Sequence, residues 1–274
     1  MKDVPYKVHF FSGLQELQDF APLSKLIASL QRNMPNHDVE NYFIQKREML
    51  SKADATVIAC RGAPNNYDVL GLISMRMMPK REEECPSFAF VWTVHVAESM
   101  QKGPLLMRLI AALFLAEAKT GMSLPTWTAL KTFHPSSYYA LLRLREMIGP
   151  SALLHPRIDC TKGPHVQENI VAANTAKCIA TQVEPGHAFD GDVSVIRGAG
   201  GVIGSGYWQN APRSRNESIN KFFDKYLTPN DRMLCLLGLT NDDAKRSALY
   251  LLEKWLMSGR TSRLEHKPQR GEKP

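Results

Sequence analysis

The sequence lacks the short motifs that would assign it to a function class at once. Its 274 residues contain no P-loop, no GxSxG and no HExxH pattern, so the signatures of phosphate-binding loops, serine hydrolases and zinc peptidases are missing. No stretch approaches 18 uninterrupted apolar residues, so no membrane span is indicated. The first residues, MKDVPYKVHFF, have neither a long apolar core nor a small-residue cleavage site, and we expect no signal peptide.

Cysteines are few and scattered. Five occur, at positions 60, 85, 160, 178 and 235, and no two form a CxxC pair. This odd number and wide spacing predict neither a disulfide framework nor a zinc site, and we expect no other metal site. A reducing cytoplasm is therefore the expected location.

Positive charge is in moderate excess. The net charge is +7 and the isoelectric point about 9.1, which suits a polyanionic ligand such as nucleic acid or a phosphorylated cofactor. Residues 260–274 carry five basic and two acidic side chains, a net charge of +3, so the rest of the chain is only mildly basic. This tail has one leucine and no aromatic residue, which predicts disorder. A nucleic-acid partner is therefore not expected for the body of the chain.

The order of the predicted elements favours an α+β fold. Strict alternation of strands and helices would indicate a doubly wound sheet, but here three strands follow one another along the chain. We expect a central mixed, mostly antiparallel sheet flanked by helices. The predicted strands are 4–11, 55–61, 68–77, 88–96 and 126–133, and the helical stretches are 12–32, 36–52, 104–118 and 135–147.

The second half of the chain predicts mainly helices. A helix over 164–182 and short strands at 193–197 and 202–208 are followed by a helical C-terminal extension from Asn216. We expect one domain over 1–210 with an insertion at about 161–190, a helical extension over 211–259 and a basic tail over 260–274. Thr228 is predicted to cap one short helix, and Thr240 or Asn241 the last one.

The last predicted helix, 242–256, has an apolar stripe on one side. Such a stripe packs into the core in most proteins, and a homodimer through the C-terminal helices is the alternative use. The stripe is formed by Leu249, Leu252, Trp255 and Leu256.

Residues 91–118, VWTVHVAESMQKGPLLMRLIAALFLAEA, change character halfway along. The first part alternates as a strand does, and the last part is apolar almost all round, as in a buried helix. Between them lies the turn Met100-Gln101-Lys102-Gly103-Pro104-Leu105. A helix N-terminus offers unpaired N–H donors and a partial positive charge to anions, and glycine lets a phosphate approach closely. The stretch therefore predicts an anion site at the turn.

This stretch, with its place in the element order, resembles the GNAT superfamily of acyl-CoA-dependent N-acyltransferases over about residues 4–160. In that family a strand leads into a basic, glycine-containing turn (Arg/Gln-x-x-Gly-x-Gly/Ala) that holds the pyrophosphate of coenzyme A. Lys102 and Gly103 match this pattern. Met100 stands where Arg or Gln is usual, and Leu105 where a second Gly or Ala is usual, so its side chain is expected to crowd the phosphate. Pro104 also removes one donor.

The resemblance implies a cofactor site and an activity. Acetyl-CoA, or another acyl-CoA, would give its acyl group directly to an amine acceptor, which the sequence does not specify beyond being a small molecule or protein. A backbone N–H near Val96, where members of the family splay two neighbouring strands apart, would polarise the thioester carbonyl. Residues 161–274 would hold the acceptor specificity. The implied cofactor-binding residues are Val94, Val96, Gln101, Lys102, Gly103, Leu105, Leu106 and His134, the last of which could instead cap its helix.

Four residues are candidates for proton transfer. His95 on the strand is the first candidate base, because histidine titrates near neutrality, and Glu98 is the second. Tyr138 and Tyr139 are candidates for the acid that protonates the coenzyme A thiolate, although the position most like the family's tyrosine is Leu141. A structural role for each of these side chains remains the alternative.

The remaining motif is a glycine cluster at 198–204. It follows a predicted strand but is not followed by a helix, as a dinucleotide-binding loop requires, so NAD binding is not expected. The sequence thus predicts a cytoplasmic acyltransferase without a metal. The alternatives are a GNAT-like binding or regulatory protein without catalysis, or a basic nucleic-acid-associated protein that uses the tail.

Overall fold

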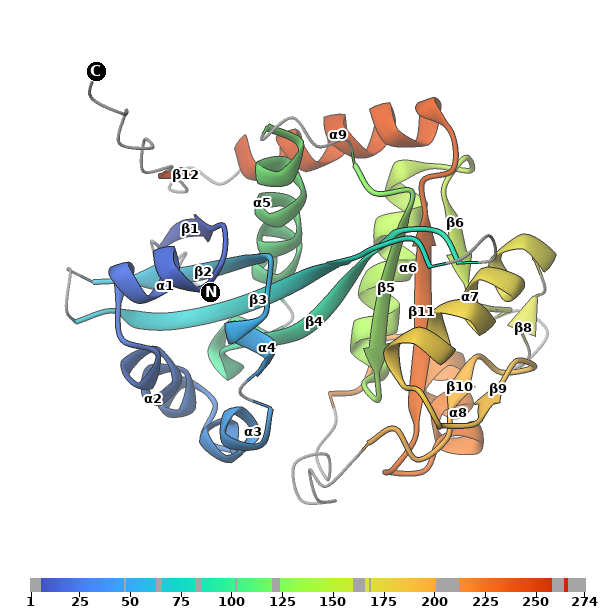
Figure 1. Cartoon of the computed structure of the whole chain (residues 1–274), viewed down its shortest axis with the longest axis horizontal. Coiled ribbons are helices and arrows are strands. Elements are labelled where there is room, and N and C mark those ends of the chain that lie inside the picture. Colours follow the sequence, from blue (N-terminus) through green and yellow to red (C-terminus); the bar gives the residue numbers. More distant parts are fainter. Residues whose placement is uncertain are drawn as a thin grey trace.

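The computed structural model describes residues 6–46, 48–62, 66–81, 85–101, 103–119, 124–159, 166–167, 169–200, 212–257 and 264–265 (Figure 1). Its helices are α1 (Leu14–Phe20), α2 (Leu23–Asn33), α3 (Val39–Gln45), α4 (Glu48–Ser51), η1 (Glu98–Met100), α5 (Leu105–Lys119), α6 (Pro135–Ile148), α7 (Ile170–Val183), α8 (Glu217–Tyr226) and α9 (Asp242–Met257). Its strands are β1 (Lys7–Phe11), β2 (Ala55–Arg61), β3 (Asp68–Met78), β4 (Phe88–Val96), β5 (Trp127–Thr132), β6 (Leu153–His155), β7 (Arg157–Ile158), β8 (Val166–Gln167), β9 (Phe189–Asp190), β10 (Val195–Ile196), β11 (Arg232–Gly238) and β12 (Leu264–Glu265).

One sheet organises the described residues. Its strands lie in the order β12-β1-β2-β3-β4-β5-β11-β10-β9, and β6 also pairs with β11. Neighbours run antiparallel except in the pairs β1–β12 and β4–β5, which are parallel. The predicted fold class, α+β with a mixed, mostly antiparallel sheet, is therefore confirmed.

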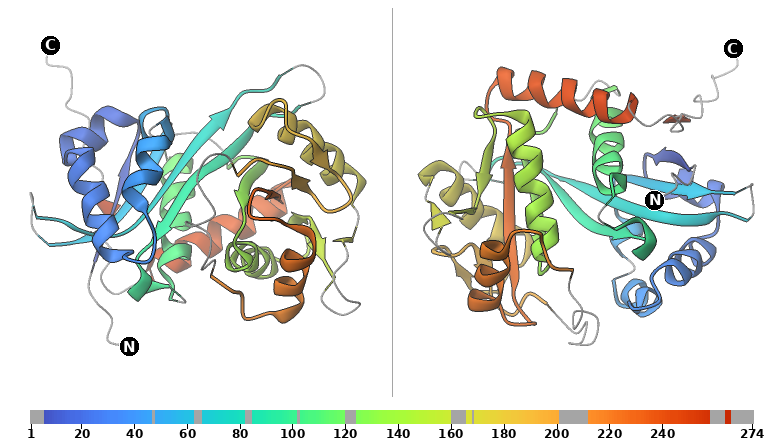
Figure 2. Two further views of the ribbon diagram at one scale, coloured as in Figure 1. Left: turned by 90° about the horizontal axis from the view of Figure 1, so that it is seen from below. Right: turned by 180° about the vertical axis from the view of Figure 1, so that it is seen from behind.

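The parallel pair β4–β5 is short, and then the two strands part. Ala89–Val91 pair with Thr128–Leu130. Beyond these residues β4 continues to Val96 and β5 to Thr132, but the two strands no longer pair with each other. A bulge lies at the same point, because Ser74 and Met75 of β3 face Thr93 and Val91 and leave Trp92 without a partner. Figure 2 shows the two strands diverging. The neighbouring, splayed strands that the resemblance implies are thus present.

Each face of the sheet has its own cover. On one face, α5 and α9 pack together over β1–β4, and α6 and α8 cover the β5–β11 half. On the other face, α1–α4 cover β1–β3, and α7 covers β4, β5 and β11. Figure 1 looks onto the α7 side. The gap between β4 and β5 therefore lies between a helical layer that contains α5, α6, α8 and α9 and another that contains α1–α4 and α7.

The predicted helical extension over 211–259 is wrong in one important respect. Arg232–Gly238 forms β11, a fully buried strand whose residues 233–238 pair with β5. Thr228 caps no helix, since its N–H and hydroxyl both donate to the carboxylate of Asp231 ahead of β11. Asn241 does cap α9, by accepting from the N–H of Ala244 at 2.8 Å.

The apolar stripe of the last helix is occupied within the chain. Leu252 is buried, and Leu249 and Trp255 pack against the cluster that α5 forms with the sheet. This favours the core role over a dimer surface, and a homodimer stays a prediction. The strand predicted at 202–208 and most of the tail lie outside the described residues, apart from β12, which pairs with β1. The boundaries at 210 and 161–190 also stay predictions.

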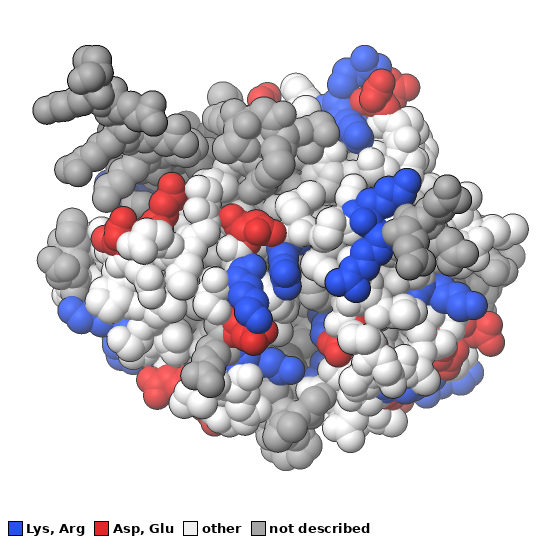
Figure 3. Space-filling view, viewed as in Figure 1, with Lys and Arg blue, Asp and Glu red and all other residues white. Residues whose placement is uncertain are grey.

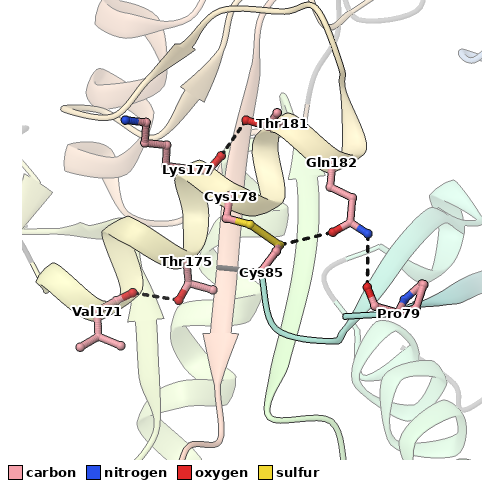
Figure 4. The surroundings of a disulfide bond; sticks show 8 residues. All are labelled: Pro79, Cys85, Val171, Thr175, Lys177, Cys178, Thr181 and Gln182. Atoms are coloured by element: carbon pink, nitrogen blue, oxygen red, sulfur yellow. Dashed lines mark hydrogen bonds between the residues drawn. A yellow bond between two sulfur atoms is a disulfide. The ribbon is translucent and has the colours of Figure 1, made fainter. Parts of the chain in front are cut away.

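The cysteines correct another expectation. Cys85, between β3 and β4, and Cys178 of α7 form a disulfide across 93 positions of sequence (Figure 4). Beside it, Gln182 Nε2 donates to the carbonyl oxygen of Pro79 at 3.4 Å, which fastens α7 to the same loop. The wide spacing gave no signal for this pair, and the ground for a reducing compartment is removed. Among the described helices, none has the length and apolarity to cross a bilayer.

Candidate functional site

The exposed edge of β4 faces the gap that β5 leaves. Ala97 N donates to Leu70 O of β3 at 2.8 Å. Along an antiparallel pair, the N–H groups of successive residues point alternately toward the partner strand and away from it. The N–H groups of Val94 and Val96 therefore point away from β3, toward the side from which β5 has diverged. The carbonyl oxygen of Val96 accepts from Gln101 Nε2 at 3.3 Å. These two predicted residues thus present backbone donors to the gap.

Helix α5 begins close to the end of β4. Its first intrahelical bond runs from Arg108 N to Pro104 O at 3.1 Å, so the preceding three amides, from Leu105 to Met107, have no acceptor within the helix. Gly103 N donates to Met100 O at 3.2 Å, and a Cβ on Gly103 would lie 3.1 Å from the same oxygen. The turn is therefore tight enough to favour glycine. Lys102 lies outside the described residues.

Leu105 corrects the expected crowding of this turn. Its side chain is fully buried, and its Cδ2 lies 3.2 Å from the point that a Cβ on Gly71 of β3 would occupy. It therefore packs against the sheet and not over the turn. Leu106, the next predicted residue, is only partly buried and packs against the same core cluster.

His95 is buried in a polar chain on the α3 side of the sheet. Its ring lies 5.0 Å from that of Tyr42 and 5.1 Å from that of Phe43. Its Nε2 is 3.0 Å from Thr93 Oγ1, which in turn lies 3.1 Å from the hydroxyl of Tyr42. Burial, with a contribution from His37, lowers the pKa of His95 to about 3, so the ring is neutral and a weak base.

Burial acts on Tyr42 as well. It raises the pKa of this phenol to about 12, although the hydrogen bond with Thr93 acts in the opposite direction. Tyr42 is therefore neutral at physiological pH, and the chain Tyr42–Thr93–His95 is an uncharged network that joins α3 to β4.

The other candidates for proton transfer are occupied in different ways. Both carboxylate oxygens of Glu98 accept from Asn36, from its N–H at 2.9 Å and its side-chain amide at 2.7 Å. Tyr138 is fully buried, and its hydroxyl donates to Pro156 O and accepts from Ile158 N. This hydroxyl is fixed inside the protein, which favours the structural role. Tyr139 is partly buried against the α6–α8 cluster.

His134 stands at the start of α6, but its side chain makes no capping bond. Its N–H donates to Thr132 Oγ1 at 2.9 Å. Burial first, and then nearby His37 and Arg232, lower the pKa of His134 to about 3. His134 is thus a neutral group at the end of β5 that occupies the N-cap position of α6 through its backbone, without a capping bond from its side chain.

Sequence reasoning missed two basic residues of the same region. Lys131 of β5 pairs with Glu184, and its ammonium lies 5.8 Å from the centre of the Phe90 ring. Burial, with Lys46 and Arg232 nearby, lowers the pKa of Lys131 to about 7. Arg232 opens β11 and is 6% exposed, with its guanidinium 5.6 Å from the Phe133 ring centre. The available signals were a lysine within the half-buried β5 pattern and an arginine at the start of the apolar run RMLCLLG.

Within the described ranges, no three His, Cys, Asp or Glu side chains come close enough to hold a metal ion. The chemistry that this region offers is therefore that of backbone donors, a helix N-terminus and buried basic groups. Its strand order, parted β4–β5 pair and following helix are those that the resemblance implies, and the fold is GNAT-like.

Comparison with known proteins gives matches among solved structures, whereas no family model and no curated protein matches the sequence. An aminoglycoside acetyltransferase, HMB0005, from an uncultured soil metagenomic sample is 20% identical, covers 43% of this chain and 76% of its own, and has a TM-score of 0.30. A CoA-dependent acyl-homoserine lactone synthase, BjaI, solved with MTA, is 11% identical, covers 96% and 95%, and has a TM-score of 0.43. The NatC complex bound to Gag peptide and CoA is 16% identical, covers 56% and 89%, and has a TM-score of 0.35. At these sequence identities and TM-scores, the matches assign no substrate and no assembly to this chain.

Proposed function

We propose that this protein transfers an acetyl or other acyl group from acyl-CoA to an amine by direct attack. The supporting observation is the parting of the parallel pair β4–β5 beside the N-terminus of α5. The gap offers an extended thioester a strand edge with backbone donors. The helix N-terminus offers the pyrophosphate three amides and a partial positive charge.

The residues divide between the two ends of the donor. The amides from Leu105 to Met107, with Lys102 and Gly103 in the turn, would bind the pyrophosphate. The N–H groups of Val94 and Val96 would hold the pantetheine arm and polarise the thioester carbonyl. Gln101 would support this edge through the carbonyl oxygen of Val96. His134 would border the gap from the β5 side.

The transfer needs no covalent enzyme intermediate. The amine nitrogen attacks the thioester carbon, a C–N bond forms and the C–S bond breaks. The amine loses a proton to solvent or a nearby base, and the thiolate takes one up to leave as coenzyme A. The low pKa of His95 makes it a neutral orienting group in this scheme. Tyr139 is the acid that we propose to test, because Tyr138 is held by two backbone groups.

A single amide tests the proposal. Val96→Pro removes the N–H that faces the gap and leaves the bonds of the neighbouring residues to β3 in place. Val96→Ala is the matched control, since it loses the same side-chain packing but keeps the N–H. We expect Val96→Pro to bind acetyl-CoA in calorimetry but to release free coenzyme A about 100-fold more slowly with amine acceptors.

Two outcomes would overturn this proposal. Equal turnover by Val96→Pro and Val96→Ala would show that the N–H takes no part in catalysis. Binding of acetyl-CoA by the wild type without release of coenzyme A, over a broad set of amines, would identify a binding or regulatory protein instead. If calorimetry detects no heat of binding with acetyl-CoA, acetyl-CoA is not the donor.

A further inference from the structure

Three neighbouring strands direct basic and polar side chains to one face of the sheet. Because side chains alternate along a strand, Lys131 of β5 lies on the same face as Ala129, and Arg232 of β11 on the same face as Leu234. Ala129 and Leu234 both belong to the cluster under α7. Past the bulge in β4, His95 lies on this face too, against α3. The face therefore carries a polar region between α3 and α7.

Positive charge exceeds negative charge in this region. Lys46, which ends α3, and Arg232 both act electrostatically on Lys131. Against these three cations stands Glu184, which pairs with Lys131. Asp231 also attracts Arg232, and Arg197 pairs with both Asp231, at 3.1 Å, and Asp190. Figure 3 shows Lys and Arg side chains around the middle of this face, with Asp and Glu side chains among them. With Lys131 protonated, the four cations and the three carboxylates Glu184, Asp190 and Asp231 leave a net charge of about +1.

Such an excess of partly buried charge is costly unless an anion balances it. We propose that the acyl acceptor carries an anionic group, a carboxylate or phosphate, in addition to its amine, and that Lys46, Lys131 and Arg232 bind this group. The inference rests on the proposed function and names the substrate class of that same site.

The placement separates this region from the donor's phosphates. Helix α5 packs on the opposite face of the sheet, and its N-terminus lies beyond the end of β4. The cations lie on the α3 and α7 side. Donor and acceptor would thus approach the gap from opposite faces, with the anionic group held beyond the attacking amine. A fixed anchor of this kind orients the nucleophile and lowers the entropic barrier of a two-substrate reaction.

The test uses acceptors in matched pairs on the full chain. Glycine is compared with glycinamide, and phosphoethanolamine with ethanolamine, with release of free coenzyme A as the readout. Lys46→Gln removes one cation at the end of a helix, where it is half-buried and disrupts no strand. Lys52→Gln is the control, because Lys52 is exposed in the same segment and pairs only locally with Glu48.

We expect the anionic member of one pair or both to be the better acceptor by at least tenfold in kcat/KM. Lys46→Gln should reduce that preference about tenfold, and Lys52→Gln should leave it unchanged. Preference within the glycine pair assigns a carboxylate, and within the phosphoethanolamine pair a phosphate.

The failures are distinguishable. Release of coenzyme A with neutral and anionic amines at equal rates overturns this inference and leaves the proposed function standing. No release with any amine overturns both. If Lys46→Gln weakens binding of coenzyme A in calorimetry but not of dephospho-coenzyme A, the cations serve the donor's 3′-phosphate, and the inference is overturned.

Discussion

The two faces of the sheet near the β4–β5 junction bury different kinds of side chain, aliphatic on one face and basic or polar on the other. Under α5 and α9 the contacts are aliphatic, with Leu105, Leu109 and Ala112 fully buried against β2 and β3. On the α3 and α7 side, β4, β5 and β11 bury His95, Lys131 and Arg232. The sheet thus carries a dry face that fixes the position of its strands and a polar face that buries basic groups.

This contrast separates stability from chemistry. Aliphatic burial is non-directional and contributes by area, so the dry face can hold β4 rigid up to the point where β5 leaves it. On the polar face, desolvation lowers the pKa of His95, Lys131 and Arg232. Changes on the dry face should therefore lower stability at any pH, and changes on the polar face should act through charge, ligand or pH.

The largest effect is expected at Leu105. Its truncation to alanine leaves a cavity under Gly71 and should lower the free energy of unfolding by about 4 kcal/mol. Leu106→Ala, one residue on and only partly buried, should cost about 1 kcal/mol, since less apolar area is lost. Urea denaturation measures both. Equal losses would show that Leu105 is not the side chain that seats α5 on the sheet.

The next effect concerns the fastening of the polar face. The Cys85–Cys178 disulfide ties α7 to the loop before β4, and its loss through Cys178→Ser should cost about 3 kcal/mol. Hydrogen exchange should show lower protection in α7 and unchanged protection in α5, because only the polar face loses its cross-link. Cys235→Ser, a buried cysteine outside the disulfide, is the comparison. Uniform loss of protection across both helices would remove the distinction between the faces.

Much of this architecture was predictable because its signals are local. The pattern ATVIACR, bounded by turn residues, predicts a strand over 55–61, and these residues form β2. The strand predicted over 88–96 is β4. The failures share a non-local cause. RMLCLLG is an apolar run that does not distinguish strand from helix, and its pairing partner β5 lies about a hundred residues earlier. The Cys85–Cys178 pair is likewise set by how α7 docks, which no spacing reveals.

The site divides in the same way. The turn before α5 lies only a few residues after β4, so the sequence alone predicts where the helix begins, and the role of Gly103 stays a prediction. Lys131 and Arg232 become neighbours only because β11 adds to β5. The lowered pKa of His95 could not be predicted from the sequence either, because it depends on burial by α3. A residue type predicts which chemistry is available, and the packing around it decides the charge.

A smaller effect should come from acid. The pKa of His95 is about 3 in the folded chain and 6.5 in the unfolded chain, so between these values the unfolded state binds more protons and stability falls as the pH falls. From pH 7 to pH 5 this group should cost about 2 kcal/mol, and His134 adds to the loss in the same direction. His95→Phe, which keeps a ring beside Tyr42 and Phe43, should lose about 2 kcal/mol less over that range. Thr93→Val, which retains the histidine, should keep the full pH dependence, and an unchanged slope in His95→Phe would exclude His95 as its source.

The smallest effect is expected where neither face is involved. Lys102→Glu reverses one charge in the turn before α5, beside a helix terminus whose partial positive charge attracts phosphate. Its cost is limited by solvent screening, so we expect coenzyme A to bind about fivefold to tenfold more weakly, a change of roughly 1 kcal/mol, with no change in the free energy of unfolding. Calorimetry at low and at high salt measures this, and the difference between variant and wild type should shrink as salt rises. Lys102→Gln should give about half the effect, because it removes the attraction without adding repulsion. If both variants bind as the wild type does at every salt concentration, the turn contacts no phosphate, and the donor must be held by the strand edge of β4 alone.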